Sequence, residues 1–539
     1  MHGVSGGHGQ ANRLLIEDID PEQFDRIVAN GGVGEDLEQV TLVESMRVGN
    51  KLLGPSRFGK MFRSLAPFRP SDQALIDLGR AMRESQPEDP ALNNSDIPAG
   101  FTYLGQFIDH DITRDNTEGF PPFEDPELIK QGRRVTLELD SLYGQGPGRN
   151  PDLYAPGFPR NRAVFRLGPT TPVSNSPFGS SFNRDFSLLN DLPRMSDKIA
   201  FLGDDRNDEN TIVAQTHVAF LKFHNGVIDR LMRDEDQDDE DHRGTRFDRA
   251  KRRVTWHYQW LVLNDFLPNL IDPDILNDIR TNGRRFYKFD RDPFDGEPFM
   301  PLEFSAAAYR LGHSMIREQY NFNSVFSDPL QVPGAFFPAT LQFLFQFSGK
   351  GGLGGSPTLP TNWVIDWRRF FPVDDPGLLN FTRRIDTTLA PKLHELPNVK
   401  PDQPISLAVR NLIRGSRVGL PTGQDVAKAM NEAISVQALT RDEIASGDDG
   451  DILREHGFHE RTPLWYYILK EAELQGEGRQ LGEVGSRIVG EVFFGLLEGD
   501  PNSFVSMRPD WTPTLPSATQ GNFTMVDLLR FVNEINPIG

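Results

Sequence analysis

The sequence contains no cysteine in its 539 residues. This absence excludes disulfides, thiolate nucleophiles, iron–sulfur clusters, and zinc or haem held by cysteine. Any metal must therefore be bound by histidine nitrogen or by oxygen.

Negative charge exceeds positive charge, and the formal net charge is -20. Nucleic-acid binding depends on clustered lysine and arginine, so we expect no nucleic-acid partner. No apolar run approaches the length of a membrane-spanning helix, and the N-terminus lacks a basic region followed by an apolar stretch. We expect a soluble protein without a membrane span or a secretory signal, and we predict no particular compartment.

Alternation typical of strands is scarce, whereas helical periodicity is clear. Hydrophobic residues make up 37% and aromatic residues 10%, enough for a large core, and the 41 prolines and 49 glycines lie mostly between the periodic stretches. We predict a mainly α fold with long irregular loops and little β. The stretches with helical periodicity are 101–111, 211–232, 304–320 and 482–498.

The domain boundaries follow from the same survey. Residues 1–12 are predicted to be disordered, and 13–539 to form a single large domain with an N-terminal extension to about 95 and a core at about 96–510. The extension could wrap the core or mediate association. The glycine-rich segment 348–357 lacks the spacing of a phosphate loop and is interpreted as a flexible loop.

The first candidate functional residues lie in LGQFIDHDIT. Gln106 is four residues before His110 and therefore shares its helix face. A lone histidine on a helix is more often a hydrogen-bonded core or surface residue than a catalyst. Asp109 and Asp111 flank His110, and one carboxylate on each side is hard to explain by packing. A metal-binding loop and a surface patch remain alternatives.

Three further motifs follow in a fixed order, namely GDDRNDEN (203–210), AAYRLGH (307–313) and RNLIRGSRVGLP (410–421). Together with the Asp109-His110-Asp111 motif they resemble the animal-type haem peroxidases, the family that contains myeloperoxidase and lactoperoxidase. The resemblance covers about residues 100 to 425 and continues more loosely beyond them. It implies the mainly helical fold of that family and a bound haem b.

On one side of the haem the resemblance makes His313 the axial iron ligand. Asn411 then accepts the Nδ1 proton of His313 through its amide oxygen, which fixes the tautomer. Arg310 lies three residues before His313, and with Arg414 it is expected to bind the haem propionates. Structural salt bridges are the alternative role for both arginines.

On the other side, His110 is expected to take a proton from one peroxide oxygen and return it to the other, for which a pKa near neutrality is suitable. Arg206 then stabilises the negative charge on the departing oxygen, and the haem is left in an oxidised, ferryl state. Asp109 and Glu209 match family positions that form esters with haem. Asn210 replaces the methionine that forms a sulfonium link in myeloperoxidase, so two esters and no sulfonium are predicted.

The resemblance also implies a calcium site. Asp111 matches a family ligand, and the partner loop is VTLELDSLYG, with Thr136 and Asp140 side chains and the Glu138 carbonyl as oxygen donors. The family expects a hydroxyl two residues beyond the aspartate. This sequence has Leu142 there and Ser141 one position earlier, which leaves that ligand open.

The predicted function is reduction of hydrogen peroxide with oxidation of small anions or phenolic donors. A fatty-acid dioxygenase is the alternative, disfavoured because Arg310 occupies the position of its radical tyrosine and Tyr309 points about 100° away on an ideal helix. A haem-binding adhesion protein without catalysis is disfavoured by the presence of His110 and Arg206. A zinc hydrolase lacks HExxH, and His217 and His224 are interpreted as core residues. The reductant and the oligomeric state are not predicted.

Overall fold

The computed structural model describes residues 47–48, 51–52, 56–85, 93–117, 126–157, 163–177, 179–233, 244–290, 296–373, 376–396 and 403–539. The predicted disorder of residues 1–12 lies outside these ranges. Among the described residues, no helix combines the length and apolar character needed to cross a membrane.

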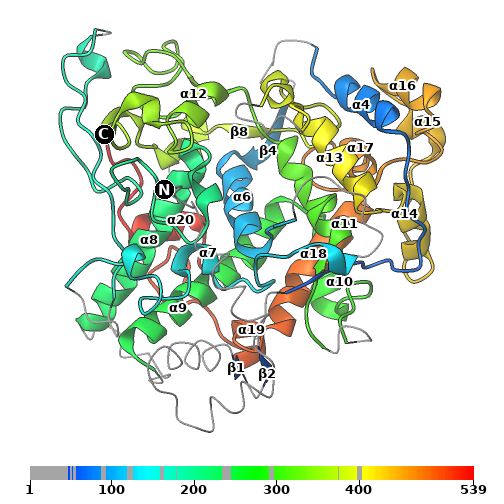
Figure 1. Ribbon diagram of the computed structural model, residues 1–539, viewed down its shortest axis with the longest axis horizontal. Helices are drawn as coiled ribbons and strands as arrows, with labels where there is room; N and C mark the ends of the chain where they lie inside the picture. The colour runs from blue at the N-terminus through cyan, green and yellow to red at the C-terminus, as the bar shows by residue number, and fades with distance from the viewer. Residues whose placement is uncertain are drawn as a thin grey trace, which may run out of the picture.

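Helices dominate the structure, as predicted from the periodicity (Figure 1). The longer ones are α4 (Asp72–Ala81), α6 (Gly100–Ile112), α8 (Thr211–Met232), α9 (Arg246–Leu261), α10 (Pro273–Asn282), α13 (Leu407–Arg417), α14 (Gly423–Asn431), α17 (Leu464–Gln475) and α18 (Glu483–Gly499). Shorter helices are α7 (Asp140–Tyr143), α11 (Leu302–Ser305), α12 (Leu341–Gln346), α15 (Arg441–Ile444), α16 (Gly450–Glu455), α19 (Phe504–Met507) and α20 (Met525–Phe531).

Strands are few and short. In the described part of the chain they form only two-stranded sheets, three antiparallel and one, β3 with β5, parallel. The strands are β1 (Arg47–Val48), β2 (Lys51–Leu52), β3 (Phe58–Gly59), β4 (Asn94–Pro98), β5 (Met300–Pro301), β6 (Gln319–Tyr320), β7 (Ala339–Thr340) and β8 (Phe381–Arg383). These two-stranded sheets join separate segments of the chain and do not form a β layer.

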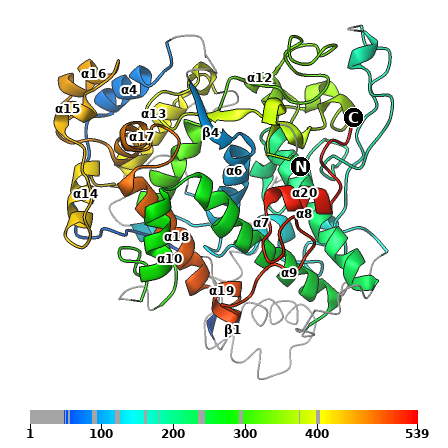
Figure 2. The same cartoon turned by 180° about the vertical axis from the view of Figure 1, so that it is seen from behind.

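Helix α6 lies at the centre of the molecule, with α8 on one side and α11, α13 and α18 on the other (Figures 1 and 2). Most of its residues are buried. It begins at Gly100, where an added Cβ would lie 2.5 Å from the carbonyl oxygen of Phe370. Glycine therefore allows the start of α6 to pack directly against neighbouring backbone, which fixes the position of the helix that carries His110.

Three of the four predicted helices are confirmed as α6, α8 and α18, but the single helix predicted over 304–320 is wrong. Helix α11 ends at Ser305, and at Ala307 the backbone leaves the helical region with φ -137° and ψ -80°. The chain then winds as a 3-10 helix over Ala308–His313, which we call the His313 segment, and later enters β6. The break re-aims the side chains that follow it.

The described part of the N-terminal extension packs on the core. The backbone N–H groups of Met61 and Phe62 each donate to the buried Glu303 carboxylate at 3.1 Å. Figure 2 shows α4 next to α16 and α13, although these elements are far apart in the sequence. Of the two predicted roles for the extension, wrapping of the core agrees with these contacts.

Candidate functional site

A cavity of about 580 Å³ lies between α6, the His313 segment and α13. Its size is within the usual range for a cofactor or ligand site. The residues predicted for the two sides of a haem line it together: Gln106, Asp109, His110, Arg206, Glu209, Arg310, His313, Asn411 and Arg414. Residues from four separate stretches of sequence therefore meet in one space.

His110 occupies the last turn of α6 and is 4% exposed. Its Nδ1 lies 2.8 Å from Oδ1 of Asn207, so this nitrogen donates to the amide oxygen and Nε2 is left with its lone pair. Burial, and secondarily the positive charge of Arg206, lowers the pKa of His110 to about 3. This corrects the expectation of a pKa near neutrality: the imidazole is neutral at ordinary pH.

Asn207 also contacts a second buried histidine. Its Nδ2 lies 3.0 Å from Nδ1 of His217 on α8, and burial lowers the pKa of His217 to about 3. His217 is thus a core residue, as its position on α8 indicated, but it is hydrogen-bonded to a neighbour of His110. No sequence pattern indicated this contact.

Arg206 is held by Asp204. In the 3-10 turn Asp205–Asp208, which we call the Arg206 turn, Nε and Nη2 of Arg206 donate to the two Asp204 carboxylate oxygens at 3.0 and 2.9 Å. Nη2 also donates to the carbonyl oxygens of His110 and Thr113 at 3.1 and 2.6 Å. Burial lowers the pKa of Arg206 but Asp204 raises it more, so the net shift is upward and the guanidinium keeps its charge.

Arg133 approaches Asp204 from the other side. Its guanidinium, 9% exposed, donates to Asp204, to the Gly203 carbonyl and to Asp140. Although burial opposes ionisation, Arg206 and Arg133 together hold the pKa of the Asp204 carboxyl well below its usual range. One buried carboxylate therefore connects the cavity to the loop that contains Asp140.

Gln106 is positioned by the start of α8. Its Oε1 accepts a hydrogen bond from Nδ2 of Asn210 at 3.0 Å, and Oδ1 of Asn210 caps α8 by accepting from the Val213 N–H at 2.9 Å. The residue that replaces the family methionine therefore orders a helix end and a cavity side chain together.

Asp109 and Glu209 both line the cavity. Asp109 accepts the Thr113 hydroxyl at 2.7 Å, and burial raises the pKa of its carboxyl despite the opposing charge of Arg206. Glu209 lies 3.3 Å from Nζ of Lys350.

Lys350 belongs to the glycine-rich segment, which the sequence indicated only as a flexible loop. In the structure this segment is hydrogen-bonded to the Arg206 turn, since the Gly349 N–H donates to Asp208 at 3.0 Å. The Ser348 hydroxyl donates to the Glu209 carbonyl, also at 3.0 Å. A loop with no assigned role thus borders the cavity.

On the opposite side, His313 and Asn411 are in contact as predicted, with 2.7 Å between His313 Nδ1 and the Asn411 amide. The orientation of that amide differs from the prediction. Its nitrogen, Nδ2, is placed toward His313, because Oδ1 accepts from Nη1 of Arg310 at 3.1 Å. Burial, and secondarily Arg310, lowers the pKa of His313 to about 3, so its imidazole is neutral and suited to a metal.

Three arginines line this side of the cavity: Arg310, Arg410 and Arg414. Arg414 forms an ion pair with Asp115, and Nε of Arg310 donates to the Ser305 carbonyl at 3.0 Å. The sequence prediction named two of them and missed Arg410. The sequence spacing could have indicated Arg410, because it precedes Arg414 by four residues and therefore shares its face of α13.

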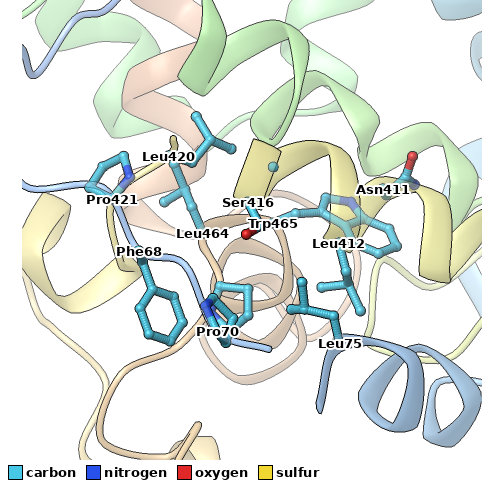
Figure 3. Close-up of a pocket in the computed structure, with 12 residues that line it drawn as sticks. Phe68, Pro70, Leu75, Asn411, Leu412, Ser416, Leu420, Pro421, Leu464 and Trp465 are labelled. Atoms are coloured by element: carbon cyan, nitrogen blue, oxygen red, sulfur yellow. The ribbon is translucent and has the colours of Figure 1, made fainter. Parts of the chain in front are cut away.

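Behind Asn411 the helix α13 rests on the N-terminal extension. Figure 3 shows Phe68, Pro70 and Leu75 below Leu412 of α13 and Trp465 of α17, around a small apolar pocket of about 20 Å³. This volume is close to that of a single water molecule. The packing fixes the position of Asn411 from the side that faces away from the large cavity.

Tyr309 also lines the cavity, contrary to the prediction that it points away. Its hydroxyl donates to the carbonyl oxygen of Gly105 on α6 at 3.2 Å, and its ring stacks on Phe304 at 4.7 Å. The prediction assumed a regular α-helix, whereas the break at Ala307 and the 3-10 winding turn Tyr309 toward α6.

Asp111 and the loop that follows Arg134 come together as predicted for a calcium site. The two Asp111 oxygens accept the backbone N–H groups of Leu139 at 3.0 Å and Ser141 at 3.3 Å. Leu139 is buried in the left-handed region with φ 60°, which is strained for leucine. The loop therefore adopts an unfavourable conformation in order to wrap this carboxylate.

The oxygen atoms of this loop suit a hard cation. The hydroxyls of Thr136 and Ser141 are buried and have no hydrogen-bond partner among the described residues. Burial raises the pKa of the Asp111 carboxyl well above its usual range and that of Asp140 to about 6. Buried carboxylates and unpaired hydroxyls are the oxygen donors that calcium prefers.

Other features of the loop limit the ligand set. The Glu138 side chain is paired with Arg134, so this residue has only its carbonyl to offer. The described residues contain no group of three or more acidic or histidine side chains that could hold a metal. A cation here therefore requires the hydroxyl and carbonyl oxygens as well as the two aspartates.

Comparison with known proteins agrees with this site. The model of the animal haem peroxidase family matches residues 176–343, a range that contains Arg206 and His313 but not α6. A peroxidase-like protein of Margaritifera margaritifera is 29% identical over 200 residues, 36% of this chain and 23% of that protein. The peroxidasin homolog pxn-2 of Caenorhabditis elegans is 25% identical over 325 residues, 59% of this chain and 22% of its own length. The chain thus spans less than a quarter of these relatives.

Solved structures share the fold over most of the chain. Peroxidase A from Dictyostelium discoideum superposes with a TM-score of 0.58 at 16% identity, covering 90% of this chain and 94% of that one. A fatty acid alpha-dioxygenase of Arabidopsis thaliana gives 0.55 at 13% identity, covering 90% and 76%. The resemblance to animal haem peroxidases is therefore confirmed over residues 176–343, and the chain shares the mainly helical fold of these solved structures.

Proposed function

We propose that the chain is a haem peroxidase that reduces hydrogen peroxide and oxidises a small anionic or phenolic donor. The observation that carries the proposal is the single cavity lined by His110 and Arg206 on one side and by His313 and Asn411 on the other. One large domain over 13–539 is part of the proposal, supported by a continuous hydrophobic core from Phe58 to Ile538.

The residues present fit haem b. His313 is neutral and in contact with Asn411, and Arg310, Arg410 and Arg414 offer guanidinium groups to the propionates. Asn411 supports an iron ligand only with its oxygen toward Nδ1 of His313. Pairing of Arg310 with a propionate would release that oxygen, and the Asn411 amide would then be able to turn it toward His313.

Haem bound between these residues would supply the redox chemistry that cleaves the O–O bond of peroxide. Nε2 of His110 accepts the proton of one peroxide oxygen and returns it to the other, so that this oxygen leaves as water. Arg206 stabilises the negative charge on that oxygen while the bond breaks. Gln106 lies one helical turn before His110 and lines the same cavity. Asp109 and Glu209 are proposed to form esters with haem, which acid extraction of peroxide-treated protein tests.

The test is the absorption spectrum of haem-loaded protein beside His313→Ala. We expect a Soret band that depends on His313 and shifts when peroxide is added. His394→Ala is the matched control, because His394 is buried and bonded to Ser406 outside the cavity. Equal haem binding without His313 would overturn the proposal.

A fatty-acid dioxygenase is the second candidate, and Tyr309 is the observation that favours it. Its hydroxyl lies in the cavity, and fatty acid alpha-dioxygenases share the fold. Its hydrogen bond is to a carbonyl, however, which cannot take up the phenol proton. Oxygen uptake with linoleate that disappears in Tyr309→Phe would favour the dioxygenase. Peroxide-dependent iodide oxidation that survives in Tyr309→Phe supports the peroxidase.

We also propose a calcium ion held by Asp111, Asp140, the Glu138 carbonyl and the Thr136 hydroxyl, with Ser141 as the hydroxyl left open by the sequence. The discriminating variant is Thr136→Val, which replaces a buried unpaired hydroxyl by a methyl group. With calcium bound it should lower the melting temperature, and in excess chelator the difference should vanish. No effect of the chelator on wild-type stability would remove the site.

A further inference from the structure

We propose that Asn207, anchored by His217, is a positioning residue that sets the tautomer of His110. The inference rests on the proposed function, because it assigns a role to residues around the base of that reaction. Asn207 lies in the GDDRNDEN motif but has no assigned role there, and His217 was interpreted only as a core residue. Both are buried, Asn207 at 0% and His217 at 1% exposed.

The geometry places one amide between two imidazoles. Oδ1 of Asn207 lies 2.8 Å from Nδ1 of His110, and Nδ2 lies 3.0 Å from Nδ1 of His217. A primary amide has an acceptor end and a donor end. A neutral histidine carries a proton on only one ring nitrogen, so the two rings must adopt opposite tautomers. The protonation of His217 and that of His110 are therefore linked through Asn207.

The observed orientation is the one that the reaction needs. Nδ1 of His110 donates to Oδ1 of Asn207, which leaves the Nε2 lone pair of His110 to accept a proton from peroxide. With the amide reversed, His110 would carry its proton on Nε2 and could not act as a base. Reversal would also require His217 to carry its proton on Nδ1, because the Asn207 oxygen would then face that nitrogen.

The backbone explains how a single turn performs two tasks. Arg206 and Asn207 are adjacent in the Arg206 turn, which Asp204 caps by accepting the Arg206 N–H at 2.9 Å. Arg206 extends toward Asp204 and the cavity, whereas Asn207 reaches between α6 and α8. The turn thus supplies both the group that stabilises charge and the group that orients the base. The charged groups around His110 are Arg206, Asp204 and Lys350.

The first test reads the tautomer directly. Full-length protein labelled with ¹⁵N-histidine and loaded with diamagnetic zinc protoporphyrin is studied by NMR, with His110→Gln identifying the His110 signal. We expect His110 to carry its proton on Nδ1 and His217 on Nε2. In Asn207→Leu the Nδ1 preference of His110 should be lost. His110 protonated on Nε2 in the wild type, or unchanged in Asn207→Leu, would overturn the inference.

The second test measures cyanide association with the ferric haem protein, because hydrogen cyanide must give its proton to a distal base. Asn207→Leu should slow association about 10–100-fold, the range for groups that orient a histidine. His217→Leu should act similarly, and His217→Gln should restore most of the rate because its amide oxygen can accept from Asn207. If Asn207→Leu does not fold, the comparison of His217→Leu with His217→Gln tests the inference instead.

The control is Asn225→Leu, two turns beyond His217 on α8. Asn225 exchanges two hydrogen bonds with the Phe165 backbone outside the cavity, so its loss is comparable and should not change the rate. If His110→Leu itself binds cyanide as fast as the wild type, the proposed function fails. If His110→Leu is slow while Asn207→Leu and His217→Leu are fast, only the inference fails.

Discussion

The two sides of the cavity differ in whether their polar side chains already have the hydrogen-bond partners that the proposed chemistry requires. On the side of His110, each polar group has the partner that the proposed chemistry requires: Asn207 for His110, Asp204 for Arg206, and Asn210 for Gln106. On the side of His313, Arg310 holds the oxygen of Asn411 that an iron ligand would need. For the proposed reaction, the side of His110 is therefore already arranged, whereas the side of His313 would need another partner for Arg310.

The largest effect should come from replacing His110, the proposed base, on the side of the cavity where each polar group has its partner. His110→Leu should lower the rate constant for reaction with peroxide by about 10²–10⁴, the usual contribution of general acid–base catalysis. Stopped-flow absorption of the haem measures it. His456→Gln is the control, because His456 contacts Asp77 at 3.4 Å outside the cavity. An unchanged rate would mean that the arrangement around His110 has no part in the reaction.

On the side of His313, Asn411→Leu should weaken haem binding about 10–100-fold, because His313 loses the partner that orients it. Titration of the full chain with haem measures the affinity. Asn225→Leu serves again as the control. Equal affinity would show that Asn411 stays bonded to Arg310 in the loaded protein and does not support His313.

Acid should destabilise the protein through its buried histidines. Burial lowers the pKa of His217 to about 3, of His224 to about 4 and of His257 to about 3. Because the unfolded chain binds these protons near pH 6.5, stability is fully present above that pH and is lost as the pH falls toward 4. Each histidine contributes roughly 1.4 kcal/mol per pH unit.

Urea unfolding at several pH values between 7 and 5 measures this dependence. His257→Gln should make it shallower, since Nε2 of His257 accepts the Thr514 and Leu515 N–H groups and cannot be protonated in the fold. A dependence equal to that of the wild type would show that His257 is not buried as a neutral group.

The smallest effect concerns the ion pair of Arg414 with Asp115, whose side chains are 13% and 34% exposed. Asp115→Asn should change the free energy of unfolding by less than about 1 kcal/mol, as partly exposed pairs do. It should not weaken haem binding, because a propionate would no longer compete with Asp115 for Arg414. Weaker binding would indicate that Asp115 holds Arg414 in place for the haem.

The sequence predicted α6, α8 and α18 correctly because apolar residues recur in each at helical spacing. It failed for 304–320, where the pattern continues across Ala307 although the backbone does not. The resemblance to the haem peroxidases implied that His110, Arg206 and His313 share one site, and all three line one cavity. It could not predict the contacts of Asn207, since partners 97 and 10 residues away meet only through packing, nor the amide orientation of Asn411, which depends on Arg310.

The carboxylate of Asp204 has a consequence for the energy of the reaction itself. In water, a cation must reorient its surrounding dipoles each time a negative charge develops near it. Four hydrogen bonds from Nε and Nη2 already fix the guanidinium of Arg206. Folding has therefore fixed this charge in advance, and the transition state of the proposed reaction would incur little reorganisation energy at Arg206.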